Sequence, residues 1–220
     1  MWYIAPVRID IDASRPLVLG SQSPRRKELL ERIGVPFIVR PADVDETVRV
    51  GERPEDYLQR VVLAKMGAVC GLAATSSTIL TADTVVVAPD GAILGKPADD
   101  REAQSMLRRL AGATHEVATR FALAVGGRPA PGAEASAAQA AFALAHAETV
   151  TTRVTFRAVS ASEIVDYVAT GEGRDKAGSY AVQGLAAAFV ARIDGSFTGV
   201  VGLPLSELCV ALRGLGWRGA

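Results

Sequence analysis

The chain has 220 residues, 49% of them hydrophobic, so it can bury a sizeable core without disulfides or a structural metal. Its 24 basic and 24 acidic side chains give a formal net charge of zero. This balance, without a basic stripe rich in aromatic residues, argues against direct nucleic-acid binding, so any recognition of phosphate has to be local.

Cysteine usage and the N-terminal segment indicate the compartment. Cys70 and Cys209 lie far apart, match no zinc spacing and fall in apolar, helix-like stretches, which favours buried free thiols in a reducing compartment. The N-terminal segment MWYIAPVRIDIDASRP has no basic region, and Asp10 and Asp12 interrupt its apolar pattern, so we expect no signal peptide. No apolar run approaches the roughly 20 residues that span a bilayer. These features predict a soluble cytoplasmic protein without a membrane partner.

Two short strands and a helix are predicted near the N-terminus. The apolar residues 16–20 predict a buried strand, and residues 36–41 (PFIVRP) predict a second one. Between them, Ser23 can cap a helix that has Pro24 at its first position and ends at Gly34.

A second helix is predicted from Pro54 to about Gly71. Its apolar stripe consists of Leu58, Val61, Val62, Met66 and Val69. Residues 77–97 then read as a strand, a Pro-Asp-Gly turn and another strand. Asp99 or Asp100 caps a further helix, which Gly112 ends.

Strands and helices are also predicted in the C-terminal half. Residues 115–127 predict a strand, and residues 148–159 alternate strictly between apolar and polar, which predicts a half-buried strand. The low-complexity, alanine-rich stretch at about 126–146 is interpreted as a hairpin tip or a frayed insertion. Ser160 and Glu163 form a capping box for a helix ending at Gly171, and a last helix runs from Pro204 to about Arg213.

These elements interleave without a regular βαβ repeat. We therefore predict an α/β fold with a mixed, twisted sheet, flanking helices and two lobes around a groove. No internal repeat and no clear linker interrupt residues 1–220, which predicts one domain.

Arg25 and Arg26 occupy the first turn of a helix, where the helix dipole disfavours cations. Together with Ser21, Ser23 and the free amides of the helix start, the two guanidinium groups suit a phosphate. The alternative is an exposed arginine pair bonded to Glu28 or Glu31, but helix stability does not require arginine at these positions.

Asp83 and Lys65 are polar residues in apolar surroundings. Asp83 could lie at a strand end, as a cation ligand or a base, or it could be a turn or bulge aspartate satisfied by backbone amides. Lys65 falls on the apolar stripe of its helix and could point into a pocket, although snorkelling along its stem is the commoner outcome.

Two loops add candidates. Lys96, in LGKP, is held between Gly95 and Pro97, which helps to aim its side chain, although loop lysines are usually solvated. Glu46 lies in the acidic loop ADVDET, which by itself favours a role in solubility. Its functional interpretation is a hard-cation ligand, since magnesium takes one or two carboxylates plus phosphate oxygens.

Several common sites are absent from the sequence. There is no G-x-x-x-x-G-K-[ST] phosphate loop and no G-x-S-x-G nucleophile elbow. His115 and His146 are the only histidines, and His115 is expected to cap or to pack, so a Ser–His mechanism has little to work with. The glycine spacing of GEGRDKAG is not that of a dinucleotide fingerprint.

Eight segments in chain order resemble the motifs of the Maf family of nucleoside triphosphate pyrophosphatases: SQSPRRKELL, VDET, LAKMGA, ADTVVV, LGKP, MLRRLAGATHEVAT, DKAGSYAVQG and GLPLSEL. The resemblance runs from about Leu17 to Leu212. It implies cleavage of a nucleoside triphosphate between the α- and β-phosphates with a divalent metal, Mg²⁺ or Mn²⁺. It also implies a two-lobed α/β fold around a cleft, related to inosine triphosphate pyrophosphatase, and a homodimer by analogy only.

The resemblance also implies residue roles. Asp83 falls on the family's catalytic acid, described as the proton acceptor, while Arg25, Thr84 and Gln183 fall on positions associated with base preference. These residues resemble the subgroup that acts on dTTP and UTP. The 7-methyl-GTP subgroup carries different residues, including an acidic one in place of Gln183.

A working arrangement follows from these roles. Lys65 and Lys96 would act beside Asp83 in catalysis, and Glu46 with Asp83 would hold the metal. The same two lysines, together with Arg25, Arg26 and the amides after Ser21 and Ser23, would clamp the phosphates. Gln183 offers both a donor and an acceptor to uracil or thymine. The alternatives are a 7-methyl-GTP-type enzyme, or a regulatory nucleotide-binding protein, since members have been linked to arrest of cell division.

Three departures from the family pattern stand out. Gly20 replaces the usual alanine before the first serine. An N-terminal extension of about 15 residues and the alanine-rich insertion at about 126–146 are unusual, but neither touches a motif.

Overall fold

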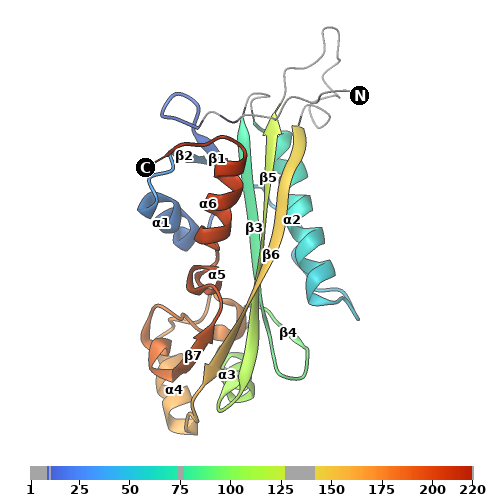
Figure 1. Cartoon of the computed structure of the whole chain (residues 1–220). Coiled ribbons are helices and arrows are strands. Elements are labelled where there is room, and N and C mark those ends of the chain that lie inside the picture. The colour runs from blue at the N-terminus through green and yellow to red at the C-terminus, as the bar shows by residue number, and fades with distance from the viewer. Residues whose placement is uncertain (1–8, 10, 74–76, 127–141, 220) are drawn as a thin grey trace.

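A computed structural model describes residues 9, 11–73, 77–126 and 142–219 of the protein. Its centre is a seven-stranded sheet in the order β2-β1-β3-β5-β6-β7, with β4 paired to β3 off this path (Figure 1). The strands are β1 (Leu17–Leu19), β2 (Phe37–Val39), β3 (Thr78–Val87), β4 (Ile93–Leu94), β5 (Thr114–Gly126), β6 (Phe142–Phe156) and β7 (Val190–Asp194).

The sheet is mixed, as predicted. β1 runs parallel to β2 and β3, and every other described pair is antiparallel. The long strands β3, β5 and β6 run through the middle of the molecule along its length.

The predicted insertion at 126–146 is partly wrong, because β6 already begins at Phe142. Phe142 pairs with Gly126 at the end of β5, and Ala147 pairs with Ala122. The alanine-rich composition hid this strand, since alanine carries little of the β-branched signal typical of strands. Residues 127–141, which include the predicted hairpin tip, lie outside the described residues.

The helices cover both faces of the sheet and one end of it (Figure 1). α2 (Pro54–Cys70) packs on β3 and β5, while α5 (Phe197–Val201) and α6 (Leu205–Gly214) lie on the other side. Around these lie α1 (Pro24–Arg32), α3 (Asp100–Leu110), α4 (Ala161–Ala169) and two short 3₁₀ helices, η2 (Ala177–Ser179) and η3 (Leu185–Phe189).

Two groups of elements are joined by the long strands, which confirms the two-lobed prediction. In Figure 1 one group, with β1, β2, α1 and α6, lies at the upper end, and the other, with β4, β7, α3 and α4, lies at the lower end. None of the helices in the described ranges is long and apolar enough to cross a membrane.

Helix caps follow local sequence. Asp99 accepts a hydrogen bond from the Glu102 amide, and Ser160 and Glu163 form the predicted capping box. Ser23 is the N-cap residue of α1, but its side chain makes no capping hydrogen bond.

The N-terminal extension contributes to the core. Ile9 and Ile11 are buried, and the Ile9 amide donates to the Leu215 carbonyl over 2.8 Å. Of the two free cysteines, Cys70 is buried as predicted, but Cys209 is only half-buried because it lies on α6 next to the exposed Val210.

Candidate functional site

The site lies at a gap along one edge of β3. β1 pairs with β3 at residues 79–80, and β4 pairs with it at residues 86–87. In the part of the chain that the structure describes, residues 81–85 have no strand partner on this edge. A pocket of about 630 Å³ opens there. Neighbouring strand residues point to opposite faces of a sheet, so Asp83 and Thr84 would normally face different environments. Here both line one cavity, because the cavity lies at the open edge of β3.

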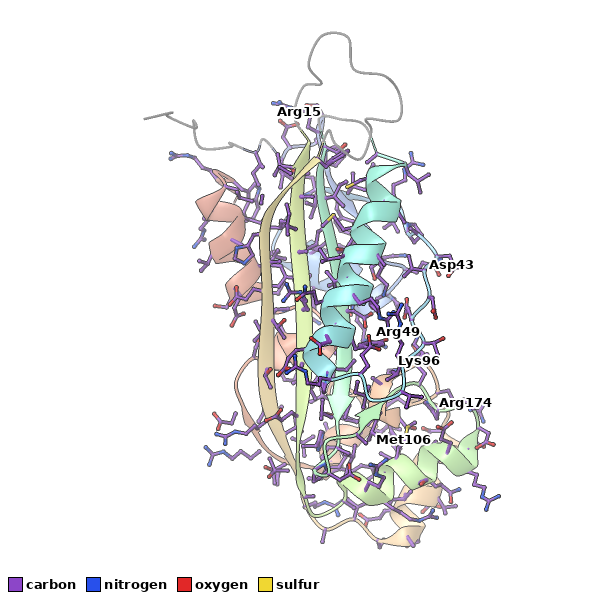
Figure 2. The ribbon with its side chains drawn as sticks, turned by 90° about the vertical axis from the view of Figure 1, so that its right-hand side faces the viewer. Arg15, Asp43, Arg49, Lys96, Met106 and Arg174 are labelled. Carbon is purple, nitrogen blue, oxygen red and sulfur yellow. The ribbon has the colours of Figure 1, made fainter. Side chains whose placement is uncertain are left out.

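The pocket brings together every residue that the sequence predicted for the site. These residues come from the N-terminal third, from β3 and the loops that follow it, and from the segment before η3. They are Ser21, Ser23, Arg25, Arg26, Glu46, Lys65, Asp83, Thr84, Lys96 and Gln183. Asp43 and Lys96, which both line the pocket, lie along the same side of the molecule in Figure 2.

Lys65 joins two carboxylates. Its Nζ atom lies 2.7 Å from Oδ1 of Asp83 and 2.8 Å from Oε1 of Glu46. The side chains of Lys65 and Asp83 are only 9% and 10% exposed, whereas that of Glu46 is 44% exposed. An ion pair this deeply buried leaves its members with few other conformations, so the three side chains form one charged cluster.

Two sequence interpretations are corrected by this cluster. Lys65 does not snorkel, because α2 turns its apolar stripe onto the sheet and the Asp83 carboxylate compensates the ammonium charge there. Asp83 is not at a strand end, turn or bulge. It lies in the middle of β3, in register opposite Arg120 of β5.

The cluster occupies a polar gap between two apolar contacts of α2 with the sheet. Towards the helix start, α2 packs through Tyr57, Leu58 and Val61 on Val85 and Ala118. Towards the helix end, it packs through Val62, Met66 and Val69 on Val18 and Ile79. The apolar contacts on either side fix the helix, and this places Lys65 opposite Asp83.

The charge state of Glu46 follows from its neighbours. Burial acts to raise the pKa of Glu46, but the hydrogen bond and charge of Lys65 outweigh it, with help from Lys96 and Arg26. The net result is a pKa below the usual range for a glutamate. Glu46 is therefore ionised at neutral pH.

Arg26 is buried and forms part of the pocket floor. It donates from Nε to the Gly202 carbonyl over 2.8 Å, from Nη1 to Ser21 Oγ over 2.9 Å and from Nη2 to Thr84 Oγ1 over 3.2 Å. Burial lowers its pKa. Arg26 thus ties α1 to β3 and to the end of α5, in addition to lining the pocket with Arg25.

Arg25 is the arginine at the pocket wall. It is half-buried and forms an ion pair with Asp175 over 3.4 Å, rather than with Glu28 or Glu31. The first turn of α1 contains no acidic residue, and Ser23 does not cap it. The helix start thus keeps its affinity for an anion.

A hydrogen-bonded chain fixes the proton of Thr84. Thr84 Oγ1 must accept from Arg26, because a guanidinium only donates. Thr119 Oγ1 must donate to the Gly199 carbonyl, 2.8 Å away, because a carbonyl only accepts. The 2.9 Å contact between the two threonines therefore runs from Thr84 to Thr119, and Thr84 can offer a ligand only a lone pair.

Some residues of the pocket were not identified as functional. Asp175 and Lys176 line it, and Lys176 Nζ donates to the Glu172 carbonyl over 2.6 Å. The sequence signal for Asp175 and Lys176 is the segment DKAGSYAVQG, in which the family resemblance implied a role for Gln183 alone. Tyr57 and Gly202 also line the pocket, but their positions depend on tertiary packing.

His115 is a packing residue, which confirms one of the two predicted roles. It is buried, its Nε2 lies 2.8 Å from the Tyr180 hydroxyl, and its ring meets Phe156 edge to face. Burial lowers its pKa to about 4, so it is neutral at pH 7. It does not line the pocket.

The groups that could bind a metal in the pocket are carboxylates. Within the described residues, no group of three or more His, Cys, Asp or Glu side chains could hold a metal ion. Glu46 and Asp83 supply two carboxylates bridged by Lys65. Such a pair suits a hard cation that takes its remaining ligands from phosphate and water.

Comparison with known proteins identifies the family of this chain. A protein from Methylobacillus flagellatus named dTTP/UTP pyrophosphatase is 44% identical over 209 residues, covering 94% of this chain and 96% of its own. One of the same name from Citrifermentans bemidjiense is 45% identical over 203 residues, covering 92% and 97%. The solved Ham1 protein of Staphylococcus aureus aligns at a TM-score of 0.38 and 13% identity, over 64% of this chain and 72% of that chain. The family model described as Maf-like protein matches residues 16–215, and the chain belongs to this family.

Proposed function

We propose that this protein is a nucleoside triphosphate pyrophosphatase that hydrolyses dTTP and UTP to the monophosphate and pyrophosphate. The observation that carries the proposal is the convergence of ten residues, from Ser21 to Gln183, in one pocket around the Lys65-bridged pair Asp83 and Glu46. The names of relatives that share nearly half of the sequence over more than 90% of this chain support the same substrates.

The triphosphate binds along the basic wall of the pocket. Arg25 and Lys96 contribute charge at the wall, and the uncapped amides at the start of α1 contribute N–H donors. Ser21 accepts hydrogen bonds from Arg26 and from the Ser23 amide, so its own hydroxyl proton remains for a phosphate oxygen.

Asp83 is the general base. It accepts a proton from water as the water oxygen bonds to the α-phosphorus, and the bond from this phosphorus to the bridging oxygen breaks. Pyrophosphate leaves with the electron pair of that bond. Lys65 holds Oδ1 of Asp83, which orients the other carboxylate oxygen towards the water, and the phosphate charge is stabilised by the surrounding cations.

A divalent cation, Mg²⁺ or Mn²⁺, fits beside these residues. The pocket is lined by five basic and four acidic side chains, so its own charge barely offsets that of a triphosphate. Glu46 and Asp83 would hold the cation together with phosphate oxygens. When bound, it supplies charge neutralisation at the phosphates and lowers the pKa of water.

Base choice rests on Gln183 and Thr84. Both line the pocket, and the exposed Gln183 amide offers a donor and an acceptor to the O4 and N3 edge of uracil or thymine. Thr84 offers only a lone pair, which suits the N3–H of these bases. The N3 of cytosine carries no hydrogen and is not matched.

We further propose a single domain over residues 1–220, action in the cytoplasm and, by analogy with the family, a homodimer. The N-terminal extension supports the single domain, because Ile9 and Ile11 belong to the same core cluster as β1, β3 and β5 residues. Sedimentation analysis at several concentrations tests the dimer.

The reaction is tested by pyrophosphate release from dTTP, UTP, CTP, GTP and 7-methyl-GTP with Mg²⁺, with Mn²⁺ and after chelation. Turnover of dTTP and UTP that needs the metal supports the proposal. Turnover of 7-methyl-GTP alone would keep the reaction and overturn the base assignment. Tight nucleotide binding without any turnover would favour a regulatory binding protein.

A further inference from the structure

The loop that carries Glu46 is held by its backbone. Three consecutive carbonyls in this loop accept hydrogen bonds from side chains of α2. Arg60 Nη1 donates to the carbonyl of Asp45 over 3.2 Å, and Arg60 Nη2 donates to that of Thr47 over 2.9 Å. The Tyr57 hydroxyl donates to the carbonyl of Glu46 itself over 3.1 Å.

Arg60 is itself fixed in place. Its Nε and Nη2 atoms form a two-point contact with the Glu52 carboxylate, at 2.6 and 2.8 Å. The Arg60 and Glu52 side chains are only 19% and 8% exposed, and the guanidinium lies over the Tyr57 ring, 5.4 Å from its centre. A planar guanidinium with two carboxylate and two carbonyl contacts has one orientation available to it.

The same helix therefore holds Glu46 twice. Arg60 holds the backbone on both sides of Glu46, and Tyr57 holds the Glu46 carbonyl. Lys65 holds the Glu46 carboxylate. The loop has no helix or strand of its own between β2 and α2, so these contacts set where the Glu46 carboxylate lies. Within the described residues, the other hydrogen bonds and ion pairs between Glu46 and α2 are those with Tyr57 and Lys65.

We infer that Arg60 is a positioning residue for the reaction, acting through Glu46 by clamping residues 45–47 onto α2. This inference rests on the proposed function, because it gives Glu46 a part in catalysis. Arg60 does not line the pocket, so it acts without touching substrate. A misplacement of about 1 Å in a catalytic group can cost about 100-fold in rate.

The test compares Arg60→Ala with Arg53→Ala in the metal-loaded enzyme with UTP. Arg53 is the matched control, since it stands at the start of the same helix and its side chain pairs with Asp56. We expect Arg60→Ala to lower kcat by about 10- to 100-fold with a smaller change in KM, and Arg53→Ala to leave both within about twofold. Arg60→Lys should recover little, since an ammonium cannot reproduce the fork. Equal effects of Arg60→Ala and Arg53→Ala would overturn the inference.

A second pair of measurements separates positioning from general stability. In a Glu46→Gln background, Arg60→Ala should lower kcat by a further factor of less than about two, because the carboxylate that Arg60 positions is already lost. Amide hydrogen exchange of residues 44–50 should accelerate in Arg60→Ala and not in Arg53→Ala. The positioning role would be contradicted if the losses in kcat of Glu46→Gln and Arg60→Ala multiplied in the double variant. It would also be contradicted if amide exchange of residues 44–50 were unchanged in Arg60→Ala. Full activity of Glu46→Gln would instead sink the role proposed for Glu46, and the exchange data would still decide whether Arg60 clamps the loop.

Discussion

Lys65 of α2 and Asp83 of β3 form a buried ion pair, 2.7 Å from Nζ to Oδ1, in the middle of the packed interface between helix and sheet. Neither residue lies at an end of its element, so both are held by packing on two sides. A buried charge pair is a costly way to join a helix to a sheet, and replacing such pairs by apolar residues is often neutral or stabilising. Its position in the pocket wall fits the catalytic role that we propose for it.

Asp83→Asn should abolish the general base and keep the shape of the site. We expect kcat for UTP to fall by about 100- to 10,000-fold, the usual contribution of acid–base catalysis, while nucleotide binding is retained. Steady-state kinetics and a binding titration measure the two effects. Asp90→Asn, in the turn before β4 and paired with Arg109, is the control and should remain active. More than a tenth of normal activity in Asp83→Asn would exclude it as the base.

Lys65→Met should cost stability as well as activity, because it leaves the Asp83 carboxylate buried without its partner. Breaking a buried pair typically costs about 3–5 kcal/mol in the free energy of unfolding, which urea denaturation measures. Lys27→Met, on α1 and outside the pocket, is the control. Adding Asp83→Asn to Lys65→Met should restore part of the lost stability, and the absence of any recovery would contradict the pairing argument.

Thr119→Val should weaken discrimination between UTP and CTP. The change removes the acceptor of the Thr84 proton, so the Thr84 hydroxyl can turn and donate into the pocket. We expect the ratio of kcat/KM for UTP over CTP to fall by about 2- to 10-fold, as one hydrogen bond allows. Thr155→Val, which removes a hydroxyl that contacts Thr114 outside the pocket, should leave the ratio unchanged. An unchanged ratio in Thr119→Val would show that the Thr84 proton does not set base choice.

His115 should make the fold sensitive to mild acid. Burial lowers its pKa from 6.5 to about 4, so the unfolded chain binds a proton before the folded chain does as the pH falls. Stability is therefore complete above pH 6.5 and is lost progressively down to about pH 4. The loss between pH 7 and pH 5 is about 2 kcal/mol. Denaturation of His115→Gln at both pH values should lack this difference, and an equal pH dependence in the variant would refute the assignment.

Ser160→Ala separates fold stability from chemistry. It removes the capping box at the start of α4, and its cost is about 1 kcal/mol in the free energy of unfolding. Neither Ser160 nor Glu163 lines the pocket, so kcat and KM for UTP should be unchanged at a temperature where the variant is folded. Thermal denaturation beside steady-state kinetics checks both expectations, and a reduced kcat would imply that α4 communicates with the site.

Local sequence determined most of the elements of this protein. Helix caps join residues within one helical turn, so they could be predicted directly from the sequence. Examples are Ser160 with Glu163 and Asp99 with Glu102. The stripe of α2 and the alternation of β6 after residue 148 likewise follow from helical and strand periods. The motif resemblance also identified which residues share the site, although it could not give their contacts. Where alanine replaced the stronger strand formers, as in residues 142–147, the local signal failed.

The tertiary structure alone decided which contacts these residues make in the site. Arg26 reaches the Gly202 carbonyl across 176 positions of the chain and Thr84 across 58, which makes it part of the floor and leaves Arg25 at the wall. The clamp of Arg60 on residues 45–47 and the direction of the Thr84 proton depend on the same kind of contact. Such contacts exist only when separate elements pack at one distance and orientation, and no periodicity or cap records that packing.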